Sequence, residues 1–125
     1  MQKKIVPEYL IETDVLSGFL TGSYSAELFV ELLSSGVCYT SVLNATELML
    51  STESESEKLK IKQLLSALKV LGIPGRYALE VGKTGKILAL REELMVVLAR
   101  MNSLVLITQH PLRYEGTDIA IQKFK

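Results

Sequence analysis

The chain of 125 residues has a single cysteine, Cys38, and no long apolar run. One cysteine forms no disulfide within the chain, which excludes a small secreted scaffold held together by disulfides. No apolar stretch approaches the roughly 20 residues of a membrane span. The opening sequence MQKKIVPEYL also lacks the apolar core of a signal peptide. We therefore expect a soluble cytoplasmic protein with no membrane partner.

The chain also lacks net charge, because its formal charge at pH 7 is +0. This zero hides a split: residues 1–57 carry two Lys or Arg and nine Asp or Glu, whereas residues 58–125 carry twelve and five. The split indicates either a charged partner or solvated faces that happen to segregate along the chain. Apolar residues make up 48%, which is enough to bury a core, and the length fits one domain over residues 1–125.

Apolar periodicity predicts strands that alternate with helices. Short apolar or β-branched runs at residues 9–13, 37–41 and 104–107 are typical of buried strands. Because no hairpin signal separates them, the pattern favours an α/β fold, namely a three-layer α/β/α sandwich with a central, mainly parallel sheet. The predicted helices cover residues 14–20, 25–35, 44–50, 58–71, 76–90 and 92–101.

Acidic residues stand where ligands bind in such sheets, at the carboxyl ends of the strands. Glu12 and Asp14 follow the first strand, Glu47 lies in the helix after the second, and Glu92 and Glu93 open the apolar helix before the third. Carboxylates that converge repel one another, and a divalent cation is the usual reason to tolerate them. The sequence therefore predicts a metal site at this edge of the sheet.

The sequences around Glu12 and Glu47 resemble two motifs of the PIN domain family, the nuclease fold of VapC-type toxins. The family opens with a strand that leads into Asp-Thr-Asn/Ser, and residues 10–16 (LIETDVL) match it with Glu12 in the first position. The family then has a Ser followed six residues later by Glu-Leu. Here Ser41 and Glu47 keep that spacing.

Two further motifs extend the resemblance, which covers residues 9–121. An acid precedes an apolar helix and a strand that ends in Thr, and Glu92 stands sixteen residues before Thr108. Beyond this Thr the family has an acid or Asn and then a packed aromatic. This chain has His110 and Tyr114 at those positions.

The resemblance implies a divalent-metal-dependent endoribonuclease, the toxin of a toxin–antitoxin pair. In that chemistry carboxylates hold Mg²⁺ or Mn²⁺, and the metal activates a water that attacks a phosphodiester. The implied catalytic residues and metal ligands are Glu12, Glu47 and Glu92, with Asp14 as an additional ligand. RNA, an antitoxin protein and a second copy of the chain are the expected partners. The supporting residues are Thr13, Ser41, Glu93, Thr108 and His110.

Each candidate also has a purely structural interpretation. Asn44-x-x-Glu47 resembles a capping box, Asp14 could be the N-cap of the next helix, and acids are favoured in any first helical turn. His110 could be a turn residue before Pro111. The hydroxyl residues could simply end their strands. Six basic residues, Arg76, Lys83, Lys86, Arg91, Arg100 and Arg113, are candidates for contact with RNA phosphates or are merely solvated.

Departures from the family pattern keep a second function open. Glu stands at positions 12 and 92, where the family usually has Asp, and His110 replaces an acid or amide. The alternative is therefore a catalytically degenerate PIN domain that acts as an RNA-binding or protein-interaction module. A nucleotide-binding domain of another family is the third possibility. It is disfavoured because no glycine-rich loop follows the first strand, and residues 82–86 (GKTGK) lack the Walker A spacing.

Overall fold

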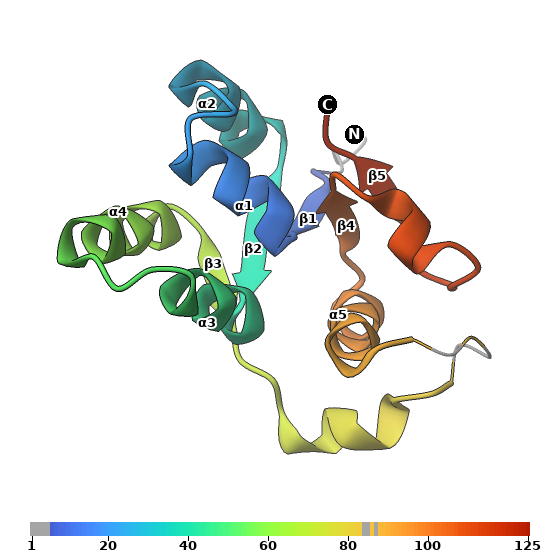
Figure 1. Ribbon diagram of the computed structural model, residues 1–125. Coiled ribbons are helices and arrows are strands. Elements are labelled where there is room, and N and C mark those ends of the chain that lie inside the picture. Colours follow the sequence, from blue (N-terminus) through green and yellow to red (C-terminus); the bar gives the residue numbers. More distant parts are fainter. Residues whose placement is uncertain (1–5, 84–85, 87) are drawn as a thin grey trace.

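In the computed structural model, which describes residues 6–83, 86 and 88–125, the centre of the molecule is a parallel sheet. The described strands follow the order β3-β2-β1-β4-β5 (Figure 1), and every pair of neighbours in this order is parallel. The predicted parallel sheet is confirmed. The strands are β1 (Glu8–Ile11), β2 (Val37–Ser41), β3 (Lys69–Leu71), β4 (Val105–Thr108) and β5 (Ile121–Lys123).

Helices cover both faces of this sheet, as Figure 1 shows: α1 to α4 lie on one side and α5 lies on the other. This layering is the predicted PIN-like α/β/α sandwich. Across the described residues, no helix has the length and apolar character needed to cross a membrane. The α-helices are α1 (Thr13–Leu20), α2 (Ala26–Ser35), α3 (Val42–Leu50), α4 (Glu55–Ser66) and α5 (Leu90–Met101); two 3-10 helices are η1 (Gly75–Glu80) and η2 (Pro111–Tyr114).

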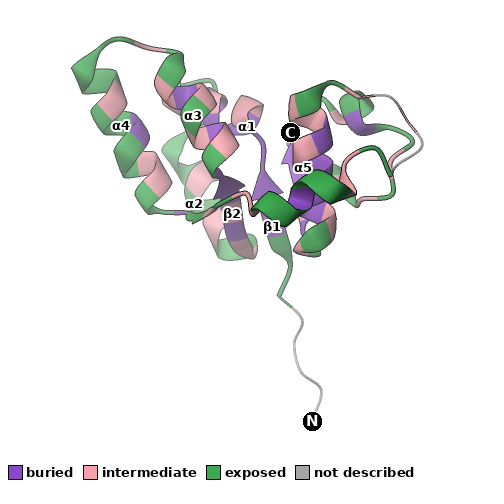
Figure 2. Cartoon of the chain, turned by 90° about the horizontal axis from the view of Figure 1, so that it is seen from below, coloured by how far each residue is buried: buried purple, intermediate pink, exposed green. Residues whose placement is uncertain are grey.

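The core consists of two apolar clusters, one on each face of the sheet. Along β1 the side chains alternate, so that Tyr9 and Ile11 enter the cluster beneath α1 and α2, whereas Leu10 enters the cluster around α5. Leu106 and Ile107 of β4 divide between the two clusters in the same way. Figure 2 shows buried residues concentrated in the strands and in α5. Burial on both faces explains why these strands read as continuous apolar runs.

The predicted helix over residues 58–71 is wrong at its C-terminal end. Helix α4 ends at Ser66, and Lys69–Leu71 form strand β3, which pairs with β2. The helical spacing of Leu64, Leu65 and Leu68 continues past Ser66, where the helix ends. Pairing of residues 69–71 with β2 determines their conformation instead of this spacing. Strand β5 had no sequence prediction, because two of its three residues are exposed at the edge of the sheet.

The predicted helix over residues 76–90 is also wrong. Its first part is the 3-10 helix η1, and the chain then turns. Gly82 has a φ of 84°, a left-handed conformation that breaks any helix and that glycine adopts without strain. Part of this prediction, at residues 84, 85 and 87, lies outside the described residues.

The parallel arrangement brings several chain segments to one edge of the sheet. Strands β1, β2 and β4 all end there, and α1 and α3 begin there. Helix α5 leads back into β4 from the other side of the sheet, so its first turn lies at the same edge (Figure 1). Residues that are far apart in the sequence therefore meet at this edge.

Candidate functional site

Glu12 is the most buried acid at this edge, with a side chain only 1% exposed. It follows β1 directly, and its backbone amide donates a hydrogen bond to the carbonyl of Ile107 on β4 (2.9 Å). Its side chain caps α1 by accepting a hydrogen bond from the Thr13 amide (2.9 Å). A buried carboxylate requires charged or hydrogen-bonding partners, and those of Glu12 come from helices on both sides of the sheet.

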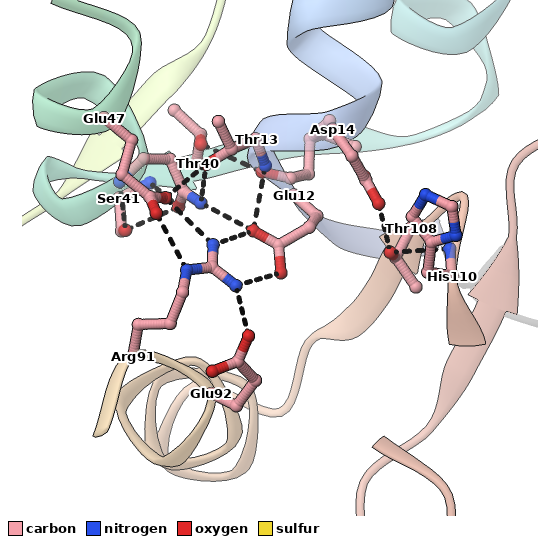
Figure 3. A network of polar contacts seen from close by, with 12 residues as sticks. Glu12, Thr13, Asp14, Thr40, Ser41, Glu47, Arg91, Glu92, Thr108 and His110 are labelled. Atoms are coloured by element: carbon pink, nitrogen blue, oxygen red, sulfur yellow. Dashed lines mark hydrogen bonds and ion pairs between the residues drawn. The ribbon is translucent and has the colours of Figure 1, made fainter. Parts of the chain in front are cut away.

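Arg91, in the first turn of α5, is the main partner of Glu12 (Figure 3). Its Nη2 lies 2.5 Å from Glu12 Oε1, and its Nη1 lies 3.0 Å from Glu12 Oε2. The same guanidinium forms a second fork with Glu47, in which Nε lies 2.8 Å from Oε2 and Nη2 lies 2.9 Å from Oε1. Nη1 also donates to Glu92 Oε1 at 3.1 Å. One cation therefore links three carboxylates.

The network continues through Asn44, which is fully buried in α3. Its Nδ2 donates to Glu12 Oε1 (3.0 Å) and to Thr13 Oγ1 (2.9 Å). The hydroxyl of Thr13 in turn donates to Glu47 Oε1 at 2.6 Å. Asn44 is held by Ser41, whose hydroxyl donates to Asn44 Oδ1 at 2.5 Å. Glu12 and Glu47 thus each accept hydrogen bonds from neutral groups in addition to their ion pairs with Arg91.

Tyr114 closes the network from η2, because its buried hydroxyl donates a hydrogen bond to Glu12 Oε2. Burial disfavours a charged Glu12, but hydrogen bonds from Arg91 and Tyr114 and the charge of Arg91 outweigh it, so the pKa of Glu12 lies below its ordinary value. Burial and the neighbouring Glu12 charge raise the pKa of Tyr114. Glu12 is therefore ionised and Tyr114 is neutral at pH 7.

Of the predicted site residues, the structure brings Glu12, Glu47 and Glu92 together. Their side chains are 1%, 32% and 15% exposed, and all three contact Arg91. Two supporting residues, Thr13 and Ser41, also belong to this network, as described above. The sequence predicted this convergence of three acids, one directly after β1, one in α3 and one in α5.

Asp14 points to a different part of the edge, as Figure 3 shows. Its Oδ2 accepts hydrogen bonds from the hydroxyl of Thr108 (2.8 Å) and the amide of Gln109 (3.2 Å). The exposed His110 donates from its backbone amide to Thr108 Oγ1 (3.1 Å). Glu93 is buried away from the cluster and accepts a hydrogen bond from the Gly82 amide. Asp14 and Glu93 therefore have structural partners of their own.

Two predicted helix caps are wrong. The box in α3 is formed by Ser41 and Asn44, each of which satisfies the other's backbone amide, and not by Asn44 with Glu47. The N-cap of α1 is Glu12 and not Asp14, because β1 ends at Ile11 and α1 begins at Thr13. Both corrections free Glu47 and Asp14 from capping roles.

The residues that sequence reasoning missed at the site are Arg91, Asn44 and the hydroxyl of Tyr114. Arg91 was grouped with basic residues that could contact RNA. A cation in the first turn of a helix is unfavourable next to the positive end of the helix dipole, and this was the one signal that Arg91 needs carboxylate partners. Asn44 and Tyr114 carried no comparable signal.

The arrangement of donors does not fit a divalent metal ion. Both oxygens of Glu12 and both oxygens of Glu47 accept hydrogen bonds from Arg91. Mg²⁺ demands near-octahedral oxygen coordination, and the guanidinium takes the oxygens that would provide it. In the described part of the chain, no three His, Cys, Asp or Glu side chains form a group that could hold a metal ion.

Comparison with solved structures places this fold among chains of toxin–antitoxin complexes. A chain of the VapBC2 complex from Rickettsia felis bound to promoter DNA superposes with a TM-score of 0.80 and 14% identity, covering 94% of this chain and 99% of that one. A chain of DNA-bound VapBC from Salmonella typhimurium superposes with a TM-score of 0.75 and 17% identity, and the match covers 94% of this chain and 98% of that one. A chain of FitAcB from Neisseria gonorrhoeae superposes with a TM-score of 0.68 and 21% identity, and the match covers 90% of this chain and 95% of that one.

The likeness is one of fold and not of sequence. No protein-family model matches the chain, and no curated protein matches it either. The structural neighbours extend over nearly the whole chain and nearly the whole of their own length. The PIN-like fold implied by the sequence resemblance is thus confirmed.

Proposed function

We propose that this toxin-like PIN-fold protein works by binding a protein partner at its acidic edge, without metal-dependent cleavage of RNA. The observation that carries the proposal is the position of the Arg91 guanidinium between Glu12 and Glu47. A divalent ion at this position would have to displace Arg91 and break both forks. This is the catalytically degenerate alternative that Glu in place of Asp had already suggested.

The charge of the edge favours a basic protein segment over RNA. Three carboxylates, on Glu12, Glu47 and Glu92, surround the single guanidinium of Arg91, and the excess charge of the cluster is negative. Nucleic-acid phosphates bind to positive surfaces, whereas charge complementarity steers a cationic peptide toward a negative one. Solved structures of similar fold include a toxin–antitoxin complex from Klebsiella pneumoniae and a VapBC toxin–antitoxin protein from Mycobacterium tuberculosis, which supports an antitoxin-like protein as the partner. A second copy of the chain stays a predicted partner.

The proposal is tested with two fluorescent probes, a mixed-sequence single-stranded RNA and an arginine-rich peptide. Each is incubated with the protein in millimolar Mg²⁺ or Mn²⁺, and anisotropy and probe length are followed. We expect salt-sensitive binding of the peptide, weaker binding in Glu92→Gln, and intact RNA. Exposed Glu31→Gln on α2 is the matched control and should bind the peptide like the wild type. Failure of the peptide to bind, or metal-dependent shortening of the RNA, would contradict the proposal.

A second candidate is the Mg²⁺- or Mn²⁺-dependent ribonuclease. It is favoured by the convergence of the three carboxylates and by the 24% exposure of the Arg91 side chain, which leaves the cluster open to solvent. Calorimetric titration of Mn²⁺ and Mg²⁺ into the wild type and into Glu47→Gln separates the two functions. We expect no saturable heat from either protein. Saturable binding that Glu47→Gln abolishes, together with RNA cleavage, would establish the nuclease instead.

A further inference from the structure

Every nitrogen of the Arg91 guanidinium lies within hydrogen-bond distance of a carboxylate oxygen, and Nη1 also lies 3.4 Å from the hydroxyl oxygen of Tyr114. An arginine side chain offers five N–H donors in a planar fork. Nε binds Glu47, Nη1 binds Glu12 and Glu92, and Nη2 binds Glu12 and Glu47. Because all three nitrogens donate to carboxylate oxygens, the positions of the carboxylates match the planar shape of a guanidinium as well as its charge.

Neutral hydrogen-bonding groups also orient Glu12 and Glu47 toward the guanidinium. Tyr114 and Asn44 bind different oxygens of Glu12, and Thr13 binds Oε1 of Glu47. Tyr114, Asn44 and Glu12 are all buried, so these orientations are fixed by packing. A lysine at position 91 would supply the charge but not the planar fork.

Burial makes a cation at this place necessary for the folded state. Two or three carboxylates brought together without a counter-ion repel one another, and a buried charge that loses its partner is strongly destabilising. In acidic clusters of this kind a divalent ion is the usual counter-ion. Here the chain supplies the cation itself, from the opposite side of the sheet.

We infer that Arg91 is the resident counter-ion of this cluster, in the place of a divalent ion. The folded protein then requires no divalent ion, and the cluster accepts one only when Arg91 is removed. This inference rests on the proposed function, since a wild type that bound Mn²⁺ at these acids would contradict both. The inference goes beyond the proposed function, because it predicts that the three carboxylates bind a divalent ion once Arg91 is removed.

The test compares thermal unfolding and Mn²⁺ binding in the wild type, Arg91→Ala and Arg91→Lys. We expect the Tm of the wild type to be the same in EDTA and in Mn²⁺. Arg91→Ala should lose about 10–20 °C in Tm and should regain part of this loss in proportion to the logarithm of Mn²⁺ concentration above the dissociation constant. Arg91→Lys should fall between the two and should not respond to Mn²⁺.

Arg100→Ala is the matched control. Arg100 also forms a bidentate ion pair, with Asp118, from the last turn of the same helix. It contacts one carboxylate instead of three, so its removal creates no cluster, and we expect no response to Mn²⁺. The double variant Arg91→Ala/Glu47→Gln should likewise lose the response, because one of the converging carboxylates is gone.

The outcomes separate the two proposals. If the wild type binds no Mn²⁺ and a folded Arg91→Ala also binds none, the inference fails while the proposed function stands. If the wild type binds Mn²⁺ at these acids, both fail. If Arg91→Ala does not fold in EDTA, recovery of its circular dichroism spectrum in Mn²⁺ supports the inference. Absence of that recovery, together with absence of Mn²⁺ binding by Arg91→Gln, overturns it.

Discussion

Glu12 links the local structure of the chain to its electrostatics. Glu12 follows the last residue of β1, and its carboxylate caps α1, pairs with Arg91 and accepts a hydrogen bond from Tyr114. The ordinary alternative for a carboxyl group buried this deeply is to become neutral, with a raised pKa. The opposite shift of Glu12 shows that the interactions with Arg91 and Tyr114 exceed the cost of burial. The stability of the protein should therefore depend on the charge of this one residue.

Substitution of Glu12 by Gln should lower stability at neutral pH and flatten its pH dependence. The substitution removes the buried charge of the pair with Arg91 and sets an amide NH2 group against the donors that surround Glu12, at a cost of about 3–5 kcal/mol in the free energy of unfolding. Because the folded-state pKa of Glu12 is lowered from 4.5, its contribution is present above about pH 4.5 and is lost as the pH falls through the lower folded-state value. Urea unfolding of both proteins from neutral to acid pH should show their stabilities converging. Parallel profiles would contradict this, and exposed Glu31→Gln should follow the wild type.

The capping box at the start of helix α3 also contributes to the site, because its Asn44 donates a hydrogen bond to Glu12. Ser41 is buried at the end of β2 and accepts a hydrogen bond from the Asn44 amide, while Asn44 Oδ1 accepts from the Ser41 amide and hydroxyl. Nδ2 of the same Asn44 side chain donates to Glu12. The N-terminus of this helix thus fixes the orientation of a charged residue on a different strand.

Substitution of Ser41 by Ala should cost more than loss of a cap alone. The N-cap contributes about 1 kcal/mol. Asn44 Oδ1 also loses the hydroxyl donor and keeps only the backbone amide of residue 41, which adds about 0.5–1.5 kcal/mol. Ser25→Ala is the control, since Ser25 caps α2 by accepting from Leu28 but is exposed. We expect chemical denaturation to show a loss of about 1.5–2.5 kcal/mol for Ser41→Ala and of about 1 kcal/mol or less for Ser25→Ala. Equal losses would show that Ser41 acts only as a cap.

Elements whose signals are local were predicted from the sequence, and those that depend on distant contacts were not. Helix α2, between Ser25 and Gly36, was predicted over residues 25–35 and is observed over Ala26–Ser35. Strand β3 was missed because it exists only through its pairing with β2, and its own three residues are mostly exposed. The three carboxylates were predicted because parallel strands end at one edge. Arg91 was not, because its 79- and 44-residue separations from Glu12 and Glu47 are closed by packing of α5.

The whole molecule is organised as two cores separated by the sheet, and the acidic cluster joins their two sides. Glu47 comes from α3 on one side, while Arg91 comes from α5 on the other. Glu12 lies between them at the end of the central strand β1. The ion pairs therefore connect the two helical layers at the edge of the sheet, so the cluster contributes to the stability of the whole molecule.

Because the sheet is buried on both faces, we expect two consecutive residues of β4 to contribute similarly to the free energy of unfolding. Leu106 and Ile107 are both 0% exposed, yet they enter different clusters. Leu106→Ala and Ile107→Ala should therefore each lower the free energy of unfolding by about 2–5 kcal/mol. Val70→Ala on β3, where the side chain is 45% exposed, should change it by about 1 kcal/mol or less. Urea denaturation of the three variants measures these losses. A large loss at only one of the two β4 positions would indicate that one helical layer is loosely packed, and would contradict a sheet that is buried on both faces.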